Sequence, residues 1–125
     1  MQHSVFLIQE KKGVKPERFY HGFVLGLLAD QAEQYEIRSN RESGFGRYDV
    51  MMIPKNQKNT DSLAFILEFK VRNPGKEKSL EETVQTALEQ IETKQYDAEL
   101  LARGIEKERI RHYGFAFDGK QVLIG

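Results

Sequence analysis

Two short apolar runs dominate the hydrophobic pattern of the chain, at residues 46–53 and 64–71. Both are rich in residues that favour β-strands, and the polar segment 54–62 between them is typical of a hairpin loop. In each run, apolar side chains occupy both sets of alternate positions, which indicates strands that are covered on both faces. The pattern therefore predicts two neighbouring strands in the middle of a covered sheet.

The register of this hairpin decides which polar side chains meet. If the loop folds about its centre, Asp49 faces Glu68, and Lys70 lies one strand step further on the same face. Two facing carboxylates repel each other and are costly to bury unpaired. A bound Mg²⁺ would offset that cost, because it favours one or two carboxylates together with waters and phosphate oxygens. The simpler alternative is that Lys70, or Arg47 on the other strand, neutralises the acids.

Helical periodicity predicts a first helix ahead of these strands. Pro16 suits a first helical position, and apolar side chains then recur at helical spacing as far as Leu28. Gly22 and Gly26 lie four residues apart and would let this helix approach the sheet closely. Further upstream, residues 5–8 form a short apolar run, for which three interpretations stay open: an edge strand, a helix end, or a segment that packs on an upstream domain.

A second helix follows the hairpin. Its start is marked by a capping box, in which Ser79 is the N-cap and Glu82 is the third helical residue. We expect this helix to bury the apolar stripe of Leu80, Val84, Ala87, Leu88, Ile91 and Ala98. A further helical turn then ends at Gly104.

Three more strands complete the predicted sheet. One covers residues 34–39 and is followed by a turn at 40–44, while the other two cover 111–117 and 120–124, joined by a two-residue turn at 118–119. The first three strands should form a meander, and the second helix a crossover to a parallel strand. We therefore predict an α/β fold with a mixed central sheet flanked by helices on both faces.

Composition limits the size and the class of the protein. With 125 residues, of which 30% are charged and 39% hydrophobic, we expect a single domain over residues 1–125, in which 1–14 are either an edge segment or a remnant. No apolar run approaches the roughly 20 residues that span a bilayer, and cysteine is absent, so we expect a cytoplasmic protein without a membrane partner. Basic and acidic residues number 19 each, which argues against strong non-specific nucleic-acid binding but allows a local basic patch.

The acidic motifs resemble those of the PD-(D/E)XK nuclease superfamily, in which an acid on one strand is followed by Asp/Glu-x-Lys on the next. Here they are residues 39–49, the Glu68-Phe69-Lys70 triplet and residues 87–91. Together they look like one branch of the superfamily, the nuclease-like domain found behind an AAA-ATPase-like domain. Tyr48 stands where the superfamily's name has proline, a position that varies. The resemblance implies a restriction-endonuclease-like fold with an α-β-β-β-α-β core.

The same resemblance implies roles for individual residues. Asp49, Glu68 and the backbone carbonyl of Phe69 would bind Mg²⁺ or Mn²⁺. Lys70 would orient the attacking water or help to deprotonate it. From the second helix, Gln90 would position water or phosphate.

Several other side chains keep two interpretations each. Glu17 either interacts favourably with the dipole of the first helix or joins the metal site. Arg41 and Arg47 either balance the acids or contact phosphate. Lys94, one helical turn after Gln90, either lies on a solvated helix edge or contacts nucleic acid. Tyr96 completes the pattern, although an aromatic side chain there is expected to serve packing.

We therefore expect a metal-dependent nuclease that hydrolyses phosphodiester bonds in DNA, with RNA as the second choice and Mg²⁺ or Mn²⁺ as cofactor. The implied partners are nucleic acid, an upstream ATPase-like domain or partner protein, and a second copy of the chain in a homodimer. The alternative is a catalytically silent module that binds nucleic acid or protein with the same fold. Zero net charge favours the alternative, whereas the presence of all three core residues favours the enzyme.

Overall fold

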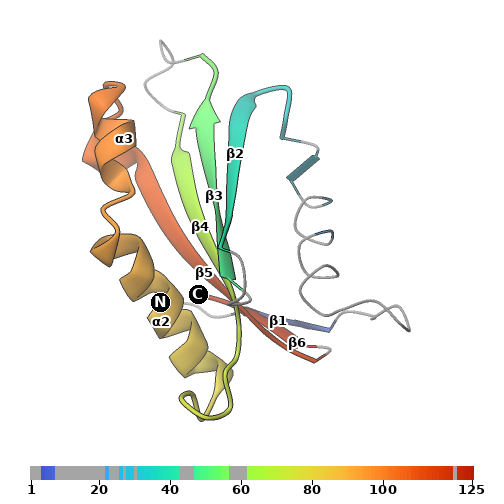
Figure 1. Cartoon of the computed structure of the whole chain (residues 1–125). Helices are drawn as coiled ribbons and strands as arrows, with labels where there is room; N and C mark the ends of the chain where they lie inside the picture. The colour runs from blue at the N-terminus through green and yellow to red at the C-terminus, as the bar shows by residue number, and fades with distance from the viewer. Residues whose placement is uncertain are drawn as a thin grey trace.

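The described part of the chain forms one six-stranded sheet with helices packed against it (Figure 1). The structure is a computed structural model that describes residues 4–7, 22, 26, 28, 29, 31–42, 47–56, 62–119 and 121–125, with the backbone alone for 4–7, 40–42, 47 and 48. The strands are β1 (Ser4–Leu7), β2 (Tyr35–Glu42), β3 (Arg47–Pro54), β4 (Ala64–Val71), β5 (Ile110–Asp118) and β6 (Gln121–Ile124). The helices are α2 (Leu80–Thr93), α3 (Asp97–Ala102) and the short 3-10 helix η1 (Lys107–Arg109).

The strands lie in the order β1-β6-β5-β4-β3-β2. β2, β3 and β4 form the predicted antiparallel meander. The segment that contains α2 and α3 then crosses over to β5, which runs parallel to β4, as a crossover of this length permits. β6 and β1 extend the sheet by antiparallel pairing, so the apolar run near the N-terminus is an edge strand. The predicted mixed sheet is confirmed.

Each face of the central strands buries its own apolar cluster. α2 and α3 lie on one side of the sheet (Figure 1), over the cluster of Met51, Ile53, Ala64, Ile66, Ile91, Leu100, Ile105 and Ile110. The opposite cluster contains Leu28, Val50, Met52, Leu67, Phe69, Phe117 and Val122. Leu28 has helical conformation and is 8% exposed, so a helical residue from ahead of β2 covers this second face. The strands of the hairpin are thus apolar on both faces because both faces are covered, as predicted.

Three local predictions are wrong at element ends. Residues 40–42 continue β2 instead of turning, because their pairing with β3 satisfies backbone groups that a turn would expose. Gln95 adopts a left-handed φ of 52°, which ends the second helix before Ala98 and leaves that side chain exposed on α3. Asp118 pairs with Gln121, so the β5–β6 turn begins one residue later than predicted.

Gly114 fixes how closely α2 approaches the sheet. A Cβ atom at this position would lie 2.9 Å from the carbonyl oxygen of Val84 and 3.2 Å from the Cβ of Ala87. Gly114 also lies opposite Glu68 in the parallel β4–β5 pairing. The helix therefore rests on the sheet next to Glu68 only because this residue has no side chain.

The glycines of the first helix do not have the predicted role. Gly22 and Gly26 are helical and exposed, and a Cβ atom built on either meets nothing within 4 Å. The expectation that they allow a close approach to the sheet is therefore wrong.

We expect Gly114→Ala to destabilise the fold by about 1–3 kcal/mol, because the added methyl group overpacks the contact between α2 and β5. Gly26→Ala is the matched control and should stabilise the protein by roughly 0.5–1 kcal/mol, since glycine is unfavourable inside a helix. Urea unfolding monitored by circular dichroism measures both changes. Equal effects of the two substitutions would contradict the close approach at Gly114.

Candidate functional site

Two buried carboxylates face each other across β3 and β4. Asp49 and Glu68 are direct partners in the antiparallel register, as the hairpin pattern predicts. Asp49 is 8% exposed and Glu68 is 2% exposed. The Oε2 atom of Glu68 is buried and accepts no hydrogen bond, although the side chain interacts in other ways. Directly opposed residues have Cβ atoms about 4.5–5.5 Å apart, so both carboxylates belong to one small site.

Lys70 lies on the same sheet face as Glu68 and is also buried. Among the described residues, its ion-pair partner is Glu77, an acid that precedes α2. Sequence reasoning missed Glu77, because it stands between two lysines in a segment with no strand or helix pattern. The simple interpretation that Lys70 neutralises Asp49 and Glu68 is therefore incomplete, since a third carboxylate shares that ammonium group.

Glu77 is held from several directions. Its Oε1 atom accepts hydrogen bonds from the backbone N–H of Asn73 at 2.9 Å and from the hydroxyl of Thr83 at 3.0 Å. Burial raises the pKa of Glu77 by desolvating its carboxylate, but the hydrogen bonds from Lys70, Asn73 and Thr83 and the charge of Lys70 outweigh that effect. The pKa of Glu77 is thereby lowered below its usual value of 4.5, so the group is ionised at neutral pH.

Tyr96 contacts the other end of the acid pair. Its hydroxyl donates a hydrogen bond of 2.8 Å to Oδ2 of Asp49, and its ring also packs on the apolar cluster below α2 and α3. The expectation of packing alone was too narrow. The position of Tyr96 within the family pattern was the signal that could have shown this role.

The position of Tyr96 depends on α3, which is attached to the sheet at two strands. At its start, Asp97 Oδ1 lies 2.6 Å from Nε2 of His112 on β5. Beyond its end, Arg103 forms an ion pair of 3.2 Å with Glu36 on β2. Partly exposed pairs of this kind contribute little stability individually, but together they fix the path of the segment that carries Tyr96.

The remaining predicted residues are less closely defined. Gln90 is partly buried on α2, and Lys94 is exposed, with its ammonium 5.9 Å from the centre of the Tyr96 ring. The side chain of Phe69 points into the opposite cluster. The backbone of Arg47 pairs with that of Lys70, and the backbone of Arg41 pairs with that of Tyr48, while Glu17 lies outside the described residues.

The donors at the acid pair fit a hydrated divalent cation. Within the described ranges, no three His, Asp or Glu side chains gather in a way that could hold a metal ion. Two carboxylates nevertheless match the preference of Mg²⁺, which keeps several waters and takes one or two protein carboxylates. When ionised, the buried Asp49, Glu68, Glu77 and Lys70 together carry two negative charges, which one such cation would balance.

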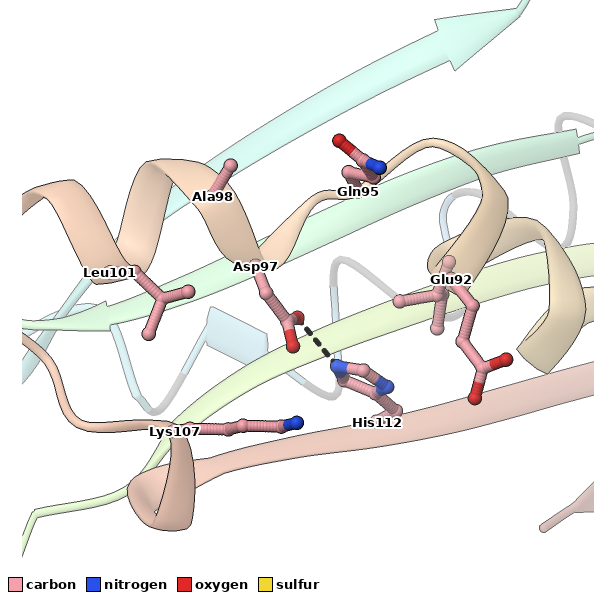
Figure 2. Close-up of a pocket in the computed structure, with 8 residues that line it drawn as sticks. Glu92, Gln95, Asp97, Ala98, Leu101, Lys107 and His112 are labelled. Atoms are coloured by element: carbon pink, nitrogen blue, oxygen red, sulfur yellow. Dashed lines mark hydrogen bonds and ion pairs between the residues drawn. The ribbon is translucent and has the colours of Figure 1, made fainter.

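A separate cavity of about 440 Å³ lies between the end of α2, α3, η1 and β5. Figure 2 shows Asp97 and His112 pointing toward each other in it, with Lys107 beside them. Among the described residues that line it there is no serine, threonine, cysteine or tyrosine, so none of them offers the His112–Asp97 pair a hydroxyl or thiol nucleophile to activate. Asp49, Glu68 and Lys70 do not line it, and the acid pair remains the candidate site.

Comparison with known proteins gives one match. A family model described as the PD-(D/E)XK nuclease superfamily matches residues 15–125, a range that contains every site residue discussed above. No curated protein and no solved structure matches the chain. In the part of the chain that the structure describes, no helix is long and apolar enough to cross a membrane.

The Lys70–Glu77 pair should make stability depend on pH. Because the pKa of Glu77 is lowered on folding, its contribution is complete above about pH 4.5 and is lost as the pH falls through the lower folded value. Glu77→Gln should destabilise the protein at pH 7 by about 1.5–3 kcal/mol, since it replaces the charged acceptor that pairs with the buried Lys70 ammonium by a neutral one.

Urea unfolding of the parent and of Glu77→Gln at pH 7, 5, 4 and 3 measures this effect. The difference between their free energies of unfolding should shrink below pH 4.5. Glu81→Gln, which removes an exposed acid from the first turn of α2, is the control and should show a small effect. A difference that stays constant from pH 7 to pH 3 would contradict the ionised pair.

Proposed function

Because the chain belongs to the PD-(D/E)XK nuclease superfamily, we propose that it is a metal-dependent nuclease that hydrolyses phosphodiester bonds in DNA. The observation that carries this proposal is the direct opposition of Asp49 and Glu68, both buried, with Lys70 on the same face. RNA is the second choice of substrate. The proposed cofactor is Mg²⁺ or Mn²⁺.

Each polar group then has a distinct task. Asp49 and Glu68 would hold the cation, and the backbone carbonyl of Phe69 would be a further ligand. The cation, when bound, lowers the pKa of a water molecule and stabilises negative charge on the phosphate. Tyr96 would fix the orientation of Asp49 through the hydrogen bond that its hydroxyl donates to Oδ2.

Lys70 and Gln90 act on the water and the phosphate. An ammonium group has three N–H donors, and among the described residues Glu77 accepts from one of them. The other donors would serve the attacking water or a phosphate oxygen. Gln90 positions the same water or phosphate from α2. In this role Lys70 orients the nucleophile next to the cation, which shortens the path of the attacking oxygen to phosphorus.

Contacts to the nucleic-acid backbone come from basic residues around the acids. Arg47 lies opposite Lys70 in the β3–β4 pairing, and Arg41 lies on the adjacent strand β2. Lys94 is exposed beside Tyr96. We assign phosphate contacts to these three residues, which would give a chain of zero net charge the local basic patch that it needs. Glu17 remains a proposed additional metal ligand.

The finer classification is also a proposal. The motifs around Asp49, Lys70 and Gln90 support the proposal that the chain belongs to the branch that follows an AAA-ATPase-like domain. We accordingly propose an upstream ATPase-like domain or partner protein, a homodimer as the assembly, and the cytoplasm as the compartment.

A catalytically silent binding module is the second candidate. Two observations favour it: the net charge is zero, and the Lys70 ammonium is already paired with Glu77. Cleavage assays decide between the two functions, using single-stranded, duplex and branched DNA and RNA at several Mg²⁺ and Mn²⁺ concentrations. We expect metal-dependent cleavage by the parent and none by Asp49→Asn. A parent chain that binds these substrates without cutting any of them would establish the silent module instead.

Metal binding should appear in thermal stability. Without metal, Asp49→Asn should melt at the same temperature as the parent or higher, because one of two opposed charges is removed. Mg²⁺ or Mn²⁺ at 100 times its dissociation constant should stabilise the parent by about 2.7 kcal/mol and Asp49→Asn by much less. Differential scanning fluorimetry over a metal titration measures both shifts. Equal shifts would mean that the cation binds elsewhere.

The catalytic role of Lys70 is tested with a substitution that also respects Glu77. Lys70→Met combined with Glu77→Gln removes both charges with little change in volume, so it avoids an unpaired buried carboxylate. We expect cleavage to fall by about 10²–10⁴-fold, as for the loss of a well-placed proton-transfer group. Single-turnover rates are measured against Mn²⁺ concentration. Full recovery of the cleavage rate at high Mn²⁺ would mean that Lys70 serves only as a counter-charge.

A further inference from the structure

We propose that Glu77 is the positioning residue for Lys70, and that it holds the lysine ammonium beside the acid pair from the start of α2. The inference rests on the proposed nuclease function, in which Lys70 orients the attacking water. It adds to that function a residue outside the strand motif. Glu77 itself contacts neither the cation nor the substrate in this scheme.

The first step of the argument is the contact itself. The Lys70 ammonium and Oε2 of Glu77 form an ion pair in which the two side chains are 9% and 6% exposed. A lysine side chain has several freely rotating bonds, so its ammonium group can reach many positions unless a partner selects one. Burial of the side chain and its ion pair with Glu77 restrict the Lys70 ammonium to a few positions.

The second step is that Glu77 is itself fixed. Its Oε1 atom accepts from Asn73 N–H and from the Thr83 hydroxyl, and its backbone N–H donates to the Asn73 carbonyl at 2.8 Å. Its own carbonyl accepts from Arg72 at 2.9 Å, and Arg72 is paired with Asp118 at 2.8 Å. Side chain and backbone of Glu77 are thus both anchored, which is what a support for a precisely placed group requires.

The third step concerns direction. Lys70 follows Glu68 by two residues on one strand, so both side chains leave the same face. Glu77 approaches that face from the N-terminal end of α2, where Thr83 is fully buried. Lys70 and the acid pair therefore share the sheet face that Glu77 approaches. A counter-charge that served stability alone would leave the cleavage rate constant of folded enzyme unchanged when replaced.

The first experiment reads the position of Lys70 without using activity. Proton–nitrogen NMR of ¹⁵N-labelled lysine side chains detects ammonium groups whose hydrogen exchange is slowed by burial and pairing. We expect a Lys70 signal that is absent from Lys70→Met, lost or strongly shifted in Glu77→Gln, and kept in the control Glu81→Gln. A Lys70 signal that Glu77→Gln leaves unchanged would overturn the proposal.

The second experiment measures the consequence for cleavage. Single-turnover rates on the DNA substrate cut by the parent should fall by about 10²-fold in Glu77→Gln, the cost of a misplacement of about 1 Å. The midpoint of the Mn²⁺ titration, followed by melting temperature without DNA, should move less than about threefold. Glu81→Gln should match the parent in both measurements. A rate in Glu77→Gln equal to that of the parent would overturn the positioning role.

A third variant keeps the test decisive if Glu77→Gln does not fold. Thr83→Val removes one hydrogen-bond donor from Glu77 and retains its charge, so we expect cleavage to slow by about 2–10-fold and the Lys70 signal to shift. An unchanged rate and signal would overturn the proposal. If the parent cuts no substrate, the nuclease function fails by itself, while the NMR comparison still decides whether Glu77 positions Lys70.

Discussion

The burial of charge on one face of an apolar sheet is the constraint on which the site depends. Asp49, Glu68, Lys70 and Glu77 are each at most 8% exposed, although the desolvation of a charged group costs several kcal/mol in a protein interior. Such groups persist only when each finds a partner, and here the partners come from different parts of the chain. Lys70 pairs with Glu77, which precedes α2. Asp49 accepts a hydrogen bond from Tyr96, which follows α2.

α2 and its two flanks support the site at both ends. The helix rests directly on β5 because Gly114 has no side chain, and this contact sets the distance between helix and sheet. The first turn of α2 carries Thr83, which donates a hydrogen bond to Glu77. Tyr96 follows the break at the end of α2 and donates a hydrogen bond to Asp49. The helix and its two flanking segments therefore hold the lysine and the acid pair in a fixed relation, which is useful for a reaction that needs both.

The fold could largely be predicted from the sequence. The two strands of the hairpin have similar lengths and are separated by one polar loop, and folding that loop about its centre gives the register that pairs Asp49 with Glu68. The capping box at Ser79 and Glu82 also marked the start of α2 correctly. Ends of elements were harder, because pairing with β3 overrides the turn propensity of residues 40–42.

The sequence by itself determined the sheet, the opposition of the two acids and the side on which Lys70 lies, because these follow from the period of two along a strand and from a hairpin loop that folds about its centre. Only the tertiary structure decided the partners of those groups. Glu77 is a charged residue in an irregular segment, and nothing local indicates that Asn73 and Thr83 would bury it against Lys70. Tyr96 follows a left-handed residue that breaks the helical phase, so its direction toward Asp49 depended on how α3 packs across the sheet.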